Sequence, residues 1–90
     1  MEWREAEKYA KKQFEKQGYV VFNPNNDDKG FPDLIVIKDR KIAFFVQVVA
    51  RQNPYVGSDE RKCAEKIKET LGVEVKYVNV KDNEKMEPYK

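Results

Sequence analysis

The sequence predicts a single α/β domain in which two helices flank a mixed four-stranded sheet, in the order α-β-β-β-α-β. Three observations predict this class. Two segments carry apolar residues at helical spacing, four short runs are rich in β-forming residues, and the second helical segment separates two strands, as a crossover connection does. Ninety residues suffice for one modest core. We therefore expect one domain over residues 1–81 and a polar tail over residues 82–90.

The first helix is expected over residues 2–17. Its apolar residues recur at steps of three and four, which defines one buried face: Trp3, Ala6, Ala10 and Phe14. Gly18 follows as a left-handed stop, because glycine adopts positive φ without strain. The run YVVF at residues 19–22 then predicts a short strand, and the turn-forming letters NPNNDDKG predict a loop that ends near Gly30.

The two most apolar runs of the chain predict a central hairpin. DLIVI at residues 33–37 and KIAFFVQVVA at residues 41–50 are joined by the polar tripeptide KDR at residues 38–40. Continuous apolar runs of this length are typical of strands buried on both faces. We therefore expect these two strands in the middle of the sheet.

The second helix and the last strand complete the predicted domain. RQNPYVG at residues 51–57 has the composition of a loop, and Ser58 is expected as the helix N-cap. The apolar face of the helix is formed by residues three and four apart: Cys63, Ala64, Ile67 and Leu71. Gly72 ends the helix, and the alternating run VEVKYVNV at residues 73–80 predicts a strand. We assign Cys63, Trp3 and Phe14 to the core.

Composition excludes several classes of function. The formal charge is only +2, and there is no stretch of 18 apolar residues, so we expect neither a strongly basic nucleic-acid binder nor a membrane protein. The absence of histidine and the single cysteine, Cys63, exclude zinc centres and Ser-His or Cys-His catalysis. A lone cysteine also agrees with a cytoplasmic, reducing compartment. Abundant lysine and glutamate suit a thermophilic source.

The chain resembles the PD-(D/E)XK nucleases, and within them the archaeal Holliday junction resolvases. AEKYAKKQFEKQGYVV is similar to that family's first helix and strand, with Glu7 at the position of its helix-borne glutamate. FPDLIVI carries the PD motif as Pro32 and Asp33, and FFVQVVA occupies the strand of the ExK motif. The likeness covers roughly residues 6–81. It implies a restriction-endonuclease-like fold and a dimer.

The resemblance also implies a metal-dependent mechanism that this chain departs from. In the family, carboxylates hold Mg²⁺ and a lysine stabilises developing charge. Glu7 and Asp33 match the metal ligands, but the ExK motif reads Gln47-Val48-Val49. Arg51 shares a strand face with Gln47 and could supply positive charge, although it stays protonated. The expected catalytic positions are therefore Asp33, Gln47 and Arg51.

A nucleic-acid surface is the second expectation. The side chains expected to contact nucleic acid are basic or aromatic: Lys8, Lys12, Lys29, Arg51 and Tyr55. The lysines at four-residue spacing on the first helix form either a binding stripe or an ordinary solvated face. Arg51 is otherwise a strand-end charge and Tyr55 a cover for the sheet edge. Asp27 and Asp28, where the family has a basic loop, would repel phosphates.

Each candidate site residue also has a structural interpretation. Asp33 after a proline could only mark the entry to a strand, and Glu7 could be a surface salt-bridge partner. Gln47 inside a strand needs a hydrogen-bond partner, for which Asp33 or a water is suitable. The letters ERK at residues 60–62 also occur at the active site of a related nuclease family, but here they belong to the exposed first turn of a helix, and we assign them no role.

Three functions are compatible with these observations. The leading hypothesis is a catalytically impaired resolvase-like domain that retains binding to branched or duplex DNA, or to a protein such as an active nuclease paralogue. The second is an active Mg²⁺-dependent endonuclease with rearranged ligands. The third is a structural or protein-interaction module without nucleic acid. Mg²⁺ is expected if the chain is active, and no cofactor otherwise. Residues 47 and 49 could reflect natural decay or deliberate engineering.

Overall fold

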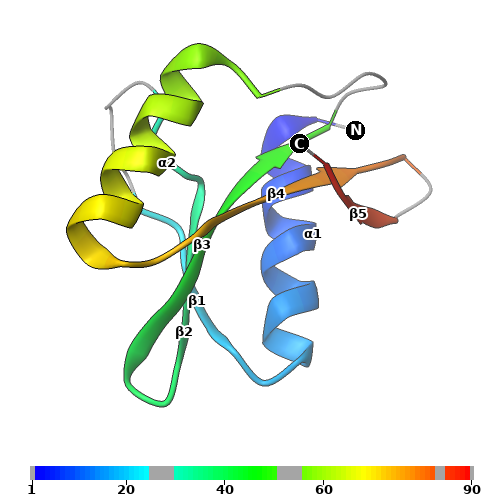
Figure 1. The fold of residues 1–90 in the computed structure, drawn as a ribbon. Helices are drawn as coiled ribbons and strands as arrows, with labels where there is room; N and C mark the ends of the chain where they lie inside the picture. The colour runs from blue at the N-terminus through cyan, green and yellow to red at the C-terminus, as the bar shows by residue number, and fades with distance from the viewer. Residues whose placement is uncertain (1, 25–29, 51–55, 83–84, 90) are drawn as a thin grey trace.

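The computed structural model of the chain describes residues 2–24, 30–50, 56–82 and 85–89, which form two helices on opposite sides of one sheet (Figure 1). In chain order the described elements are α1 (Trp3–Lys16), β1 (Val20–Phe22), β2 (Leu34–Lys38), β3 (Lys41–Val49), α2 (Ser58–Leu71), β4 (Val75–Val80) and β5 (Met86–Pro88). Neither described helix is long and apolar enough to cross a membrane.

The strands follow one another across the sheet in chain order, β1-β2-β3-β4-β5. β3 and β4 are parallel and α2 connects them, so the predicted crossover is confirmed, while the other pairs are antiparallel. The sheet has five strands where the sequence predicted four. The fifth lies in the expected polar tail: β5 pairs with the end of β4, and Met86 packs against the core.

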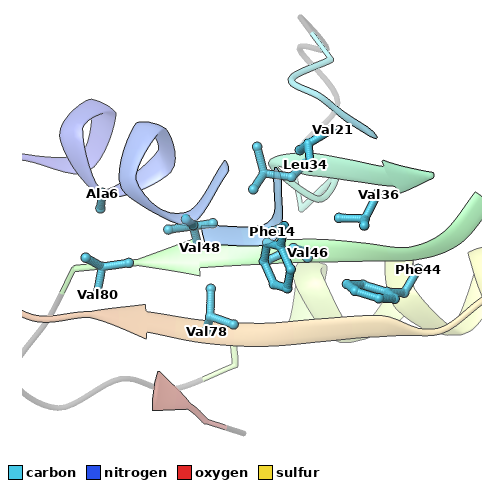
Figure 2. Close-up of a cluster of buried hydrophobic side chains, with 11 residues drawn as sticks. Ala6, Phe14, Val21, Leu34, Val36, Phe44, Val46, Val48, Val78 and Val80 are labelled. Atoms are coloured by element: carbon cyan, nitrogen blue, oxygen red, sulfur yellow. The ribbon is translucent and has the colours of Figure 1, made fainter. Parts of the chain in front are cut away.

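The main core lies between α1 and the sheet (Figure 2). Ala6 and Ala10 are fully buried on α1, where their small side chains allow the helix to lie close to the strands. The central hairpin and β4 complete this core with their inward residues: Leu34, Val36, Phe44, Val46, Val48, Val78 and Val80. Because residues alternate along a strand, Phe45, Gln47 and Val49 of β3 point to the opposite face, on the side of α2.

Turns and helix ends largely follow the sequence signals. The β2–β3 turn is tight, and Asp39 and Arg40 both have positive φ, as a two-residue hairpin turn requires. Gly18 and Gly72 adopt positive φ after α1 and α2, so both predicted stops are confirmed. The predicted N-cap of α2 is wrong by one residue. Gly57 is the N-cap and Ser58 begins the helix.

Two residues predicted on the apolar faces of the helices are instead exposed. Trp3 is 56% exposed and Leu71 is 54% exposed, whereas Phe14 is buried as predicted and Cys63 is half-buried. Both exposed residues lie in the terminal turn of a helix. Helical spacing places such residues on the apolar face, but burial also requires a strand opposite them, which the ends of a helix often lack.

Candidate functional site

Asp33 lies immediately before β2, opposite the end of β3. Its backbone N–H donates to the Val46 carbonyl oxygen at 2.9 Å, and Pro32 before it has no N–H with which to continue the pairing. Beyond this point the Asp33 side chain, and not the backbone, accepts hydrogen bonds from β3. Its Oδ2 accepts hydrogen bonds from the Val48 backbone N–H at 2.8 Å and from Gln47 Nε2 at 3.2 Å. The predicted pairing of Gln47 with Asp33 is therefore confirmed.

The surroundings of Asp33 favour its neutral form. Burial is the largest cause that raises the pKa of Asp33, from 3.8 to about 7, and the negative charges of Glu7 and Glu60 raise it as well. The Val48 N–H acts in the opposite direction, because it stabilises the carboxylate. Three carboxyl groups, from α1, from the start of β2 and from α2, therefore interact electrostatically around Asp33.

Glu7 is a buried residue of α1 and not a surface salt-bridge partner. Its side chain is only 7% exposed, and Asn23 Nδ2, just after β1, donates to Glu7 Oε1 at 2.9 Å. Glu7 Oε2 is buried as well, and a side-chain hydrogen bond between Glu7 and Asp33 contributes to the raised pKa of Asp33. Two carboxyl groups buried together are stable when they share a proton, which agrees with the raised pKa of Asp33.

A cleft of about 510 Å³ opens beside this group. Its described lining comes from α1, from the segment before β2, from the end of β3 and from α2: Trp3, Gly30, Phe31, Asp33, Gln47, Val48, Val49, Ala50 and Glu60. Gly30 is tightly placed, because a Cβ atom there would lie 2.5 Å from the Asp59 carbonyl oxygen. The close approach of this segment to the start of α2 closes one side of the cleft.

Two lining residues were missed from the sequence. Trp3 was assigned to the core, and Glu60 belonged to the ERK segment that we gave no role. Glu60 accepts a hydrogen bond from the Gly57 N–H at 3.4 Å, so it caps α2 while it lines the cleft. A signal for Glu60 existed: a crossover helix starts near the end of the strand it follows, which places its first turn beside the end of β3.

The remaining candidates divide into two groups. Lys8 and Lys12 are exposed on α1 and are absent from the lining of the cleft. Lys29, Arg51 and Tyr55 lie outside the described residues, as do Asp27 and Asp28. The structure therefore assembles Glu7, Asp33 and Gln47 from the predicted set.

No family model matches the sequence, and no curated protein matches it. The structure, however, is similar to that of Hjc, a Holliday junction resolvase from the archaeal hyperthermophile Archaeoglobus fulgidus. The TM-score is 0.73 at 15% sequence identity, and the match covers 91% of this chain and 73% of that chain. The chain has a Holliday junction resolvase fold. The predicted restriction-endonuclease-like architecture is therefore confirmed, and at this identity the likeness concerns the fold alone.

Within this resolvase fold, the described residues do not form a good Mg²⁺ site. They contain no group of three or more His, Cys, Asp or Glu side chains placed to hold a metal ion. Gln47 turns its N–H donor toward Asp33, although a metal ligand must present an oxygen lone pair. Val49, at the lysine position of the motif, is 5% exposed and offers no polar group. The donor set is thus weaker than the family resemblance implies.

Proposed function

We propose that the chain is a Holliday junction resolvase-like domain that has lost efficient cleavage and retains binding to branched or duplex DNA. One observation carries the proposal. In the cleft, the position expected to hold a carboxylate beside Asp33 is an amide, Gln47, whose N–H donates to Asp33, and the position expected to hold a lysine is the buried Val49.

The loss of these two groups is large enough to impair catalysis. Electrostatic groups aimed at the developing charge of a transition state each contribute about 10²–10³-fold in rate. The loss of two such groups is therefore expected to slow cleavage by about 10⁴–10⁶-fold. The same substitutions leave the backbone and core of the resolvase fold in place, since Val46 and Val48 remain fully packed. A domain with these properties can keep a binding surface without the chemistry.

DNA is the favoured partner because of the fold and of the exposed lysines on α1. Lys8 and Lys12 lie one helical turn apart and both are exposed, so a phosphate backbone can reach them. The small net charge of +2 favours a modest affinity that falls as the salt concentration rises. A protein partner, such as a second copy or an active nuclease paralogue, is the alternative that the assay must distinguish.

An active enzyme with rearranged ligands receives less support from the geometry. It requires Asp33, Glu7 and a third oxygen donor to converge on one ion. Gln47 directs its nitrogen to Asp33, and its Oε1 is buried without a hydrogen-bond partner among the described residues. The third donor is therefore turned away from the carboxylate with which it would have to cooperate.

The experiment compares binding and cleavage of a four-way DNA junction by the wild type and by the Gln47→Glu, Val49→Lys double variant, each with Mg²⁺ or Mn²⁺. Gln17→Glu with Val20→Lys is the matched control, because both positions are exposed and outside the cleft. We expect salt-dependent junction binding by all three proteins, and cleavage above background by the Gln47→Glu, Val49→Lys variant alone.

Two results would contradict the proposal. Efficient wild-type cleavage that Asp33→Ala abolishes would show that the enzyme is active as it stands. Absence of binding to junction and duplex DNA at low salt would remove the nucleic-acid role and favour a protein partner. A mixing experiment with an active resolvase, followed by size-exclusion chromatography, then tests the paralogue directly.

A further inference from the structure

The orientation of the Gln47 amide is the starting point of the inference. Gln47 lies on the extended strand β3, and its Nε2 donates to Asp33 Oδ2 at 3.2 Å. The same oxygen accepts the Val48 N–H at 2.8 Å, so two donors from neighbouring residues converge on one carboxylate oxygen. The amide therefore presents the positive end of its dipole to the Asp33 carboxyl group.

A glutamate at position 47 would face a different environment. It would place a further carboxylate against Asp33, which already interacts with the buried carboxyl group of Glu7. Like charges in a partly buried group are stable only when a proton or a cation lies between them. The amide has nearly the same shape as the carboxylate and removes this requirement, because it is neutral and donates.

We propose that the Gln47 amide takes the place of a divalent cation in this cleft, so that the folded geometry around Asp33 is held without metal. A single change, Gln47→Glu, then makes the stability of the fold depend on divalent cations. The inference does not rest on the proposed function, because it concerns how the cleft is held together whichever macromolecule binds. It identifies Gln47 as a positioning residue for Asp33.

The first test is thermal unfolding of the full chain in EDTA and in millimolar Mg²⁺ or Mn²⁺. The wild type should unfold at the same temperature in all three solutions. Gln47→Glu should lower the Tm by about 5–10 °C in EDTA, and Mn²⁺ should restore most of that loss. Gln17→Glu makes the same chemical change at an exposed position after α1, and should show neither effect.

The results that would overturn the inference are distinct. A wild-type Tm that rises with Mn²⁺ as much as that of the variant would show that the native cleft already holds a cation. A Gln47→Glu variant whose Tm does not respond to metal would show that the amide does not stand in for one.

A second measurement covers the case in which the variant does not fold. In ¹H–¹⁵N NMR spectra of the wild type, the Gln47 side-chain amide and the Val48 backbone N–H should be undisturbed by Mn²⁺ at concentrations that leave the rest of the spectrum intact. Selective broadening of these two resonances would overturn the inference without any variant.

Discussion

The raised pKa of Asp33 predicts a stability that falls as the solution becomes more alkaline. Burial raises the pKa of this carboxyl group from 3.8 to about 7, so the folded protein holds a proton that the unfolded chain has released. The contribution of Asp33 to the free energy of unfolding is therefore complete below about pH 3.8 and is lost as the pH rises through about 7.

The size of this effect follows from the same shift. One differentially bound proton changes the free energy of unfolding by at most about 1.4 kcal/mol per pH unit. The shift of Asp33 spans about three pH units, which sets a ceiling of about 4 kcal/mol. Because the carboxyl group is only partly buried, solvent screening reduces this to about 2 kcal/mol. For a domain of this size, that is about 10 °C in Tm.

The assay is urea unfolding of the wild type and of Asp33→Asn at intervals from about pH 4 to about pH 8. The variant keeps an oxygen that can accept the Val48 N–H but cannot titrate. We expect the wild type to lose about 2 kcal/mol relative to the variant across this range. Asp39→Asn, on the exposed β2–β3 turn, is the matched control and should keep the wild-type pH dependence. A constant difference between wild type and Asp33→Asn would refute the reasoning.

Two further predictions concern the frame of the cleft and its binding surface. Gly30→Ala should destabilise the fold by more than Gly18→Ala in urea unfolding. Both glycines have positive φ, so each substitution costs about 1–2 kcal/mol of backbone strain, but only at Gly30 would the new Cβ atom also meet backbone. Equal losses of stability in the two variants would contradict the close approach at Gly30. The double variant Lys8→Ala, Lys12→Ala should reduce the slope of log K against log salt concentration for junction binding by about 1–2 units, as measured by fluorescence anisotropy. An unchanged slope would show that the DNA does not contact these two lysines.

The main elements of the fold were predictable because their signals are local. The spacing on α1, the two apolar runs of the hairpin and the glycines after each helix specify elements through neighbours in the sequence. β5 was missed because MEP carries neither alternation nor β-branched residues. It is a strand only because the edge of β4 offers Val78 and Val80 as pairing partners. That partner is a tertiary feature, which no local pattern of residues 82–90 contains.

The candidate site was also predictable only in part from the sequence. The pairing of Asp33 with Gln47 was predicted from the family resemblance, but the short turn does not by itself produce it. Continued from the turn, the register would set Asp33 opposite Val46, and a bulge between Val36 and Ile37 shifts it by one residue toward Gln47. Glu60 was set aside with the ERK segment, although the predicted crossover already indicated that the first turn of α2 lies near the end of β3. Trp3 shows the opposite error: helical spacing placed it in the core, while the structure leaves it 56% exposed at the rim of the cleft.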